Sequence, residues 1–263
     1  MQQMNIEQIK NCQMGIMTKI HEFCIKNGLK YSLWGGSLIG AARHGGYIPW
    51  DDDIDICMLR KDYEFFIANF NFDKYGVSSC DNDLYPYPFA KAYDKTTEKI
   101  ESVYLPKEYK IGVDVDIFPI DELNSLNNLT KAIVKKRKKL IKLRQFSLCL
   151  KNGKGIKGFL KRILATVYNG KANKYSKQLN LDAQKFSGVS SNLYMLYADP
   201  NIKMPLWIDK SIFADYQLHK FEDKEFFIVS EYDKLLTLCF GDWRKLPPES
   251  QRVTHHTFIA YQK

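Results

Sequence analysis

Four aspartates stand within five consecutive positions of this chain, where residues 51–55 read Asp-Asp-Asp-Ile-Asp. Carboxylates packed this closely repel one another unless a cation neutralises them. Alternate side chains of an extended strand share a face, so Asp51, Asp53 and Asp55 would gather on one side of a strand. Ile54 would then point into the core. Because clustered carboxylate oxygens suit a hard divalent cation such as Mg²⁺, this segment predicts metal chemistry.

A second segment repeats the pattern, since Asp114 and Asp116 alternate with apolar residues between positions 113 and 118. A solvated acidic loop would not alternate so regularly, which favours a half-buried strand. Carboxylates from two neighbouring strands predict a two-metal site for phosphoryl transfer.

Gly35, Gly36 and Ser37 stand between a predicted strand and a predicted helix. Glycines let the backbone approach a phosphate closely, and a helix N-terminus attracts anions. Ser37 can either cap that helix or bind phosphate. Gly-Gly-Ser alone is a common turn, and it becomes specific because an Asp-x-Asp follows within 20 residues.

The elements that must position these residues are helices and strands in mixed order, which predicts an α/β or α+β fold. Apolar periodicity predicts helices at 6–26, 37–43, 61–69 and 231–240, and strands at 31–34, 54–58, 76–79, 89–93, 113–118 and 226–229.

A basic segment follows the second acidic strand. Residues 123–181 contain 16 lysines and arginines and no acidic residue, whereas the rest of the chain carries a net charge of −7. Apolar residues recur there at helical spacing, which predicts two basic amphipathic helices with a break at 152–158. Three interpretations remain open: a solvated helical face, a cationic face on anionic lipid, and nucleic-acid binding. The apolar stripe favours lipid over nucleic acid, and we expect no nucleic-acid partner.

The composition excludes some classes of protein. The chain has 263 residues, of which 45% are hydrophobic and 26% charged, with a net charge of +9. These fractions are ordinary for a globular protein and argue against disorder. Neither a membrane-spanning run nor an N-terminal secretory signal is expected. Six scattered cysteines predict free thiols in a reducing compartment, so we expect a cytoplasmic protein.

In combination, these motifs resemble the LicD family, which is related to fukutin and fukutin-related protein. The resemblance runs in order from about residue 20 to 256. The matching segments are Gly35–His44, Ile48–Ile56, Arg60–Tyr63, Lys91–Asp94, Val115–Asp121, Phe221–Asp223, Phe240–Trp243, Leu246–Pro248, Arg252 and His255–His256. One departure is Asp114, which stands where the family commonly has an apolar or aromatic residue.

The resemblance implies an α+β architecture, the DNA polymerase β-like nucleotidyltransferase fold, with a mixed sheet and flanking helices. Residues 1–122 would form the catalytic core, 123–181 a basic amphipathic helical insertion, and 182–263 the C-terminal part that completes the active site.

LicD-type enzymes transfer phosphocholine from CDP-choline to a hydroxyl of a teichoic acid, lipopolysaccharide or capsule precursor, and the fukutin relatives move ribitol phosphate. The resemblance therefore implies a transferase, more narrowly a phosphotransferase, that releases CMP and uses Mg²⁺ or Mn²⁺. The metal ligands would be Asp53, Asp55 and Asp116, with Asp51 beside them. Asp116 is also a candidate to accept the proton of the acceptor hydroxyl.

Basic residues of the matching segments are candidates to hold the donor phosphates. They are Arg43, Lys91, Arg252, His255 and His256. Arg43 has a second interpretation as a helix C-terminal cap, and the histidines have one as a surface pair. A choline donor would also need an aromatic cage, for which no particular residue is singled out.

Two further functions compete with the phospho-alcohol transferase. A CDP-ribitol or CDP-glycerol enzyme would move a polyol phosphate, and a true nucleotidyltransferase would release pyrophosphate from the same carboxylates. A catalytically dead scaffold is disfavoured because every carboxylate is present. The expected partners are the CDP-alcohol and a glycan or lipid-linked glycan acceptor. The basic segment would let the protein lie peripherally on the inner face of the plasma membrane.

Overall fold

The computed structural model describes residues 1–128, 130–148, 159, 163, 166–188, 191–202, 204–254 and 258–263. Its helices are α1 (Ile6–Asn27), α2 (Gly35–His44), α3 (Arg60–Asn69), α4 (Lys131–Ser147), α6 (Ala172–Lys185) and α7 (Tyr232–Phe240), with 3₁₀ turns η1 (Leu126–Asn128), η2 (Lys210–Phe213) and η3 (Glu249–Gln251). Its strands are β1 (Gln2–Gln3), β2 (Ser32–Leu33), β3 (Asp55–Leu59), β4 (Tyr75–Ser78), β5 (Ala90–Asp94), β6 (Thr97–Glu101), β7 (Asp114–Leu123), β8 (Leu193–Met195), β9 (Trp207–Asp209), β10 (Tyr216–Phe221), β11 (Lys224–Val229) and β12 (Phe258–Gln262).

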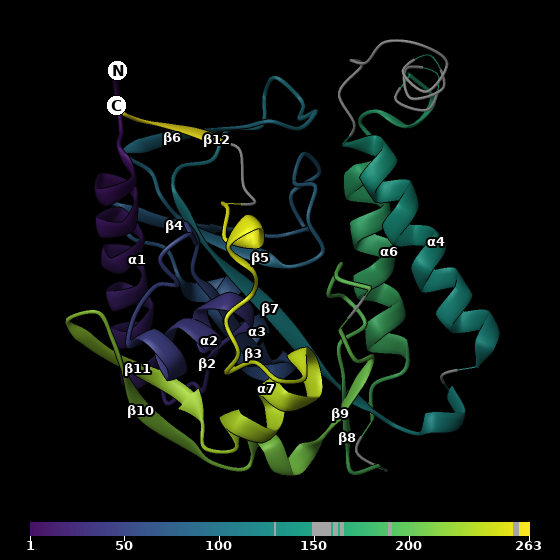
Figure 1. Cartoon of the computed structure of the whole chain (residues 1–263). Helices are drawn as coiled ribbons and strands as arrows, with labels where there is room; N and C mark the ends of the chain where they lie inside the picture. The colour runs from purple at the N-terminus through teal and green to yellow at the C-terminus, as the bar shows by residue number, and fades with distance from the viewer. Residues whose placement is uncertain are drawn as a thin grey trace.

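A mixed sheet runs through the middle of the molecule (Figure 1). Its strand order is β2-β3-β7-β5-β4, and β8 and β9 extend it from the far end of β7. Strands β3 and β7 pair in parallel, while the other neighbours are antiparallel. Two smaller sheets, β1-β12-β6 and the hairpin β10-β11, lie beside it. The mixed sheet with flanking helices agrees with the sequence prediction, and the narrower nucleotidyltransferase fold remains a prediction.

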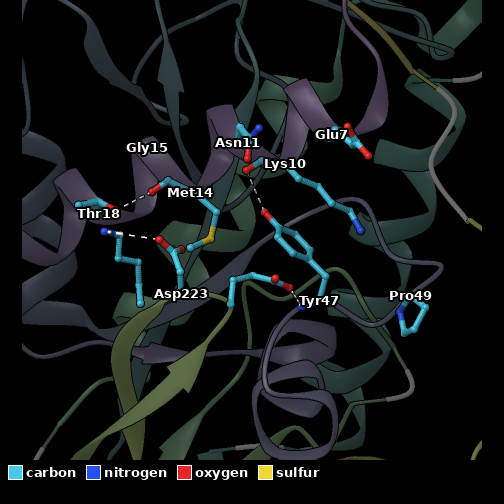
Figure 2. A pocket seen from close by; sticks show the side chains of 11 residues that line it. Glu7, Lys10, Asn11, Met14, Gly15, Thr18, Tyr47, Pro49 and Asp223 are labelled. Atoms are coloured by element: carbon cyan, nitrogen blue, oxygen red, sulfur yellow. Dashed lines mark hydrogen bonds and ion pairs between the residues drawn. The ribbon is translucent and has the colours of Figure 1, made fainter.

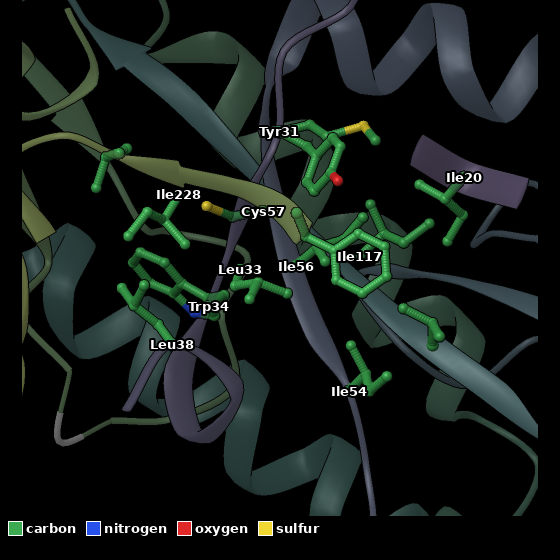
Figure 3. Packing of buried hydrophobic residues seen from close by; sticks show 14 of the residues in the cluster. Ile20, Tyr31, Leu33, Trp34, Leu38, Ile54, Ile56, Cys57, Ile117 and Ile228 are labelled. Carbon is green, nitrogen blue, oxygen red and sulfur yellow. The ribbon is translucent and has the colours of Figure 1, made fainter. Parts of the chain in front are cut away.

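The main hydrophobic core packs α1, α2 and α3 against this sheet. Figure 3 shows Leu33 of β2, Ile56 of β3 and Ile117 of β7 close together, with Ile20 of α1 nearby. All four side chains are fully buried. Ile54 is buried as well, so the alternation predicted from the sequence places the isoleucines inward.

Helix α1 has the length that its sequence predicts. Asn5 and Gln8 form a capping box at its start, and Gly28 ends it in the left-handed conformation. These local signals fix the helix ends, and the buried Ile9, Ile16 and Ile20 lie on one face.

The basic segment supplies α4, and α6 packs along it on the side of the molecule away from α1 (Figure 1). Ile141 of α4 is buried against Leu179 of α6 and Tyr197, and Ile133 and Leu140 pack around them. Part of the apolar stripe predicted for the basic segment is therefore buried in the interior of the protein. The predicted break at 152–158 lies outside the described residues, and the division of the chain at residues 122 and 181 remains a prediction.

The structure differs from the predicted elements near the carboxylates. Strand β3 begins at Asp55, one residue later than predicted, so residues 51–53 lie in a loop. We call residues 45–54, between α2 and β3, the acid loop. Strands β6 and β12 were not predicted. They pair with each other, and β12 also pairs with the two-residue β1, outside the buried sheet.

Within the described residues, none of the helices combines the length and apolar character needed to cross a membrane. Cys12, Cys24, Cys57, Cys80 and Cys239 are free thiols.

Candidate active site

The carboxylates predicted from the sequence meet where β3 and β7 begin. Asp55, the first residue of β3, lies opposite Asp116 of β7 in the parallel register. Asp51, Asp52 and Asp53 precede them, and one carboxylate oxygen from each lies within 4.8 Å of the others. Asp52, which the strand alternation did not include, therefore belongs to the cluster.

Helix α2 begins directly beside these carboxylates. A Cβ atom on Gly36 would lie 2.7 Å from Asp51 Oδ2, and one on Gly35 would lie 3.1 Å from Asp55 Oδ2. Gly35 also has a φ of 54°, in the region that favours glycine. The two glycines therefore allow the positive end of the helix to approach the acidic cluster.

Ser37 joins α2 to β3. The N-cap of α2 is Trp34, so Ser37 lies within the first turn. Of the two roles predicted for Ser37, the helix cap is therefore wrong and the phosphate contact stays a prediction. The helix begins at Gly35, two residues earlier than predicted. The buried Ser37 hydroxyl instead accepts a hydrogen bond of 2.9 Å from the backbone N–H of Asp55, which fixes the first residue of β3.

The acid loop is held from α1 and from the β10-β11 hairpin. Gln13 donates from Nε2 to the carbonyl of Asp52 at 2.9 Å, and its Oε1 accepts from the hydroxyl of Tyr47 at 3.0 Å. The Glu222 carboxylate accepts from the backbone N–H of Tyr47 at 2.8 Å. Figure 2 shows Tyr47 next to Lys10 in a pocket of about 820 Å³ between α1 and the hairpin. Two elements distant in sequence therefore position the loop.

Lys91 neutralises the carboxylates of β7. Its Nζ lies 2.5 Å from Asp116 Oδ1 and 3.5 Å from Asp114 Oδ1. Lys99 of β6 lies 2.9 Å from Asp114 Oδ1. Asp114, the carboxylate that departs from the family pattern, thus has Lys99 as a partner in addition to Lys91.

The carboxyl groups of Asp55 and Asp116 are harder to ionise than exposed aspartates. Burial raises the pKa of Asp55 well above its usual range, and the charges of Asp53 and Asp116 raise it further. Burial also raises the pKa of Asp116 to about 6, although Lys91 opposes this shift. A bound cation would stabilise these groups in their ionised form.

A cavity of about 370 Å³ opens beside Asp53, Asp116 and Lys91. It is also lined by Tyr87 and by charged residues that the sequence did not predict, among them Lys99, Glu101 and Arg144. The pairing of Asp114 with a cation could have been inferred from its expected burial. Nothing local distinguishes Arg144 from the other basic residues around it.

Arg43 connects α2 to the C-terminal part of the chain. Its Nη1 donates to the carbonyls of Trp243 at 2.6 Å and Lys245 at 3.4 Å, and its Nε donates to His44 Nε2 at 3.0 Å. The left-handed Gly45 ends α2. The structure thus places Arg43 outside the cavity that contains Lys91, and its phosphate contact remains a prediction.

Arg252 lies against the acid loop. Its guanidinium carbon is 5.7 Å from the ring centroid of Trp50, and its Nε donates to the carbonyl of Pro247 at 2.9 Å. Thr254 donates to the carbonyl of Trp50 at 3.1 Å. His255 and His256 lie outside the described residues, so their predicted phosphate contacts remain predictions.

The donor set fits a magnesium or manganese ion. The neighbouring groups are carboxylates, which are the ligands that these hard cations prefer. Asp51, Asp52 and Asp53 each place a carboxylate oxygen within 4.8 Å of the others, and Asp55 lies beside Asp116 in the paired strands. Asp51, Asp53, Asp55 and Asp116 are therefore compatible with the metal role predicted for them.

Fold and site together define a mixed α/β protein with a carboxylate and lysine centre of the type used in phosphoryl transfer. Residues 28–148 match the family described as LicD/FKTN/FKRP, nucleotidyltransferase domain. The lipopolysaccharide cholinephosphotransferase LicD of Haemophilus influenzae is 31% identical to this chain, over 94% of each sequence. The human ribitol 5-phosphate transferase FKRP is 57% identical over 35 residues, which are 13% of this chain and 7% of that protein. The chain therefore belongs to the LicD family of transferases.

Proposed function

We propose that this protein moves a phospho-alcohol, phosphocholine before any other, from a CDP-activated donor to a hydroxyl of a cell-surface glycan precursor. CMP would be released. The observation that carries the proposal is the cluster of aspartates beside the N-terminus of α2, with Asp55 opposite Asp116. The similarity to a lipopolysaccharide cholinephosphotransferase along nearly the whole chain supports a phosphotransferase that acts on glycans.

The proposed reaction is a single displacement at phosphorus. The acceptor hydroxyl oxygen forms a bond to the phosphorus that carries the alcohol, and the bond from that phosphorus to the CMP oxygen breaks. Asp116, which lines the cavity beside Lys91, accepts the hydroxyl proton. Lys91 orients the Asp116 carboxylate through their contact of 2.5 Å.

Asp51, Asp53, Asp55 and Asp116 would hold Mg²⁺ or Mn²⁺. When bound, the ion neutralises the donor diphosphate and the charge that develops on the leaving CMP. The N-terminus of α2 adds positive potential from backbone N–H groups at the same place.

The main alternative is a polyol-phosphate transferase that uses CDP-ribitol or CDP-glycerol. The similarity to ribitol 5-phosphate transferase FKRP favours it, but that match covers 35 residues. The same carboxylates would serve both reactions, so the donor has to be identified by experiment.

The test measures CMP release with CDP-choline, CDP-ethanolamine, CDP-glycerol, CDP-ribitol or CTP, in the presence of Mg²⁺ or Mn²⁺ and acceptor glycans. We expect CMP from CDP-choline, and loss of the product when EDTA is added. CMP from CDP-ribitol alone would establish the alternative. Pyrophosphate from CTP would instead indicate a nucleotidyltransferase and overturn the proposal.

A further inference from the structure

Arg144 belongs to the basic segment, but its side chain points into the body of the protein. It is 5% exposed and lines the same cavity as Asp116 and Lys91. Arg137, seven residues earlier in α4, is also buried. Residues seven apart lie on one side of a helix, so α4 directs two arginines inward while its lysines at 135, 138, 139 and 142 are exposed.

The two buried arginines differ in their hydrogen bonds. Arg137 donates to the carbonyls of Tyr197 at 2.9 Å, Leu196 at 3.3 Å and Asp199 at 2.5 Å. Within the described part of the chain, Arg144 donates only from Nε, to the carbonyl of Pro86 at 2.8 Å. A guanidinium has five N–H donors. Arg137 is therefore satisfied by protein carbonyls, whereas the described contacts of Arg144 leave both of its Nη groups available to a ligand.

A cation that is largely removed from water is costly unless it has partners. Burial lowers the pKa of Arg144, against the opposing charges of Tyr87, Glu101 and Asp116. An oxygen-rich anion in the cavity would offset this cost, because a guanidinium binds phosphate oxygens in a bidentate manner.

The aromatic residues of the cavity are already in contact with protein cations. Lys91 Nζ lies 4.9 Å and the Arg144 guanidinium carbon 4.8 Å from the Tyr87 ring centroid, and Lys99 Nζ lies 4.5 Å from that of Phe258. A quaternary ammonium needs the faces of such rings. The cavity therefore favours the phosphate part of a donor over its choline part.

The formal charges of the cavity predict how anion binding depends on metal. Among the described lining residues, Asp53, Glu101, Asp114 and Asp116 oppose Lys91, Lys99 and Arg144. The four carboxylates leave one net negative charge, which a divalent cation at the acidic cluster would reverse. Anion binding should therefore require Mg²⁺ or Mn²⁺.

We propose that Arg144 is a substrate-binding residue whose Nη groups bind a phosphate of the donor diphosphate. The basic segment then completes the catalytic cavity instead of serving only as a surface. The identity of the anion rests on the proposed function, whereas the presence of an anion site at Arg144 does not.

The test is calorimetric titration of the full chain with inorganic pyrophosphate in the presence of Mn²⁺. We expect Arg144→Gln to bind pyrophosphate at least tenfold more weakly than the wild type. Lys142→Gln removes the same charge from the exposed face of α4 and should bind as the wild type does. Equal affinity of Arg144→Gln and the wild type, or no binding to the wild type, would overturn the proposal.

Arg144→Lys keeps the charge and provides a second variant should Arg144→Gln not fold. It loses the bidentate geometry, so we expect binding at least threefold weaker than in the wild type, and unchanged binding would refute the assignment. CMP release from CDP-choline separates the two proposals. Pyrophosphate binding that depends on Arg144 without consumption of any CDP-alcohol would refute the proposed function alone. Turnover by Arg144→Gln with an unchanged KM for CDP-choline would refute the role of Arg144 alone.

Discussion

At the scale of single residues, the site depends on one lysine placed between two carboxylates. Lys91 is 4% exposed, and it contacts both Asp114 and Asp116. A buried carboxylate that loses its partner keeps its desolvation cost without the compensating attraction. Lys91 thus contributes to stability as well as to the orientation of Asp116.

Lys91→Met should therefore lower the free energy of unfolding by about 3–5 kcal/mol. Lys74→Met is the matched control, because Lys74 forms an ion pair of 3.3 Å with Asp94 but its side chain is 54% exposed. Loss of this exposed ion pair should lower the free energy of unfolding by about 1 kcal/mol or less. Urea unfolding measures the free energy of unfolding of both variants. Equal losses would show that the burial of Lys91 does not strengthen its contribution to stability.

Asp53 offers the most direct test of the predicted metal binding, because it lies in the acidic cluster and lines the cavity. Asp53→Ala should lower turnover of the CDP-alcohol about 1000-fold or more, since charge stabilisation supplies much of the acceleration. The thermal unfolding midpoint should change little. Asp73→Ala, at an exposed position, should keep its activity. Substantial turnover by Asp53→Ala would refute the assignment.

At the scale of elements, the β10-β11 hairpin positions the acid loop. Glu222 occupies the two-residue turn with a φ of 56°, a conformation that usually favours glycine. Its backbone N–H donates to the carbonyl of Gly45 at 2.8 Å, while its carboxylate accepts from Tyr47. Through these two contacts Glu222 holds the loop that carries Asp51, Asp52 and Asp53.

Glu222→Ala should therefore weaken Mn²⁺ binding about tenfold, in the range seen when groups that orient metal ligands are removed. Glu222→Gln keeps an acceptor oxygen for the backbone N–H of Tyr47, so its affinity for Mn²⁺ should fall much less. Asp223→Ala changes the other residue of the same turn and serves as the control. Titration with Mn²⁺ measures all three, and identical affinities would show that the hairpin does not position the site.

The elements also explain which parts of the site were predictable. Asp55 and Asp116 could be placed on neighbouring strands from the sequence because alternation within a strand is local, whereas Asp53 lies in the acid loop before β3. Lys99 and Arg144 could not be placed, because β6 and α4 reach the cavity through tertiary packing. The cap alternative for Ser37 is excluded because the helix begins at Gly35, a residue with low helix propensity, and the phosphate contact of Ser37 stays a prediction.

At the scale of the whole molecule, positive charge gathers on one side. The described outer face of α4 carries Lys131, Lys135, Lys138, Lys139 and Lys142 around the less polar Val134, Leu143 and Phe146, which line a groove of about 720 Å³. The inner face of α4 packs on α6 and extends Arg144 into the cavity. One helix thus connects a cationic surface to the proposed catalytic site, which would place the site near an anionic membrane carrying a lipid-linked acceptor.

We therefore expect the protein to sediment with phosphatidylglycerol vesicles at low salt, and to be released as ionic strength rises. Each lysine near an anionic surface contributes about 1 kcal/mol, so a Lys138→Gln, Lys139→Gln, Lys142→Gln triple variant should bind about 100-fold more weakly. A control triple at the exposed Lys26, Lys61 and Lys107 makes the same change in net charge elsewhere. Equal losses in both triples would mean that net charge alone attracts the protein, and no sedimentation at low salt would refute membrane binding altogether.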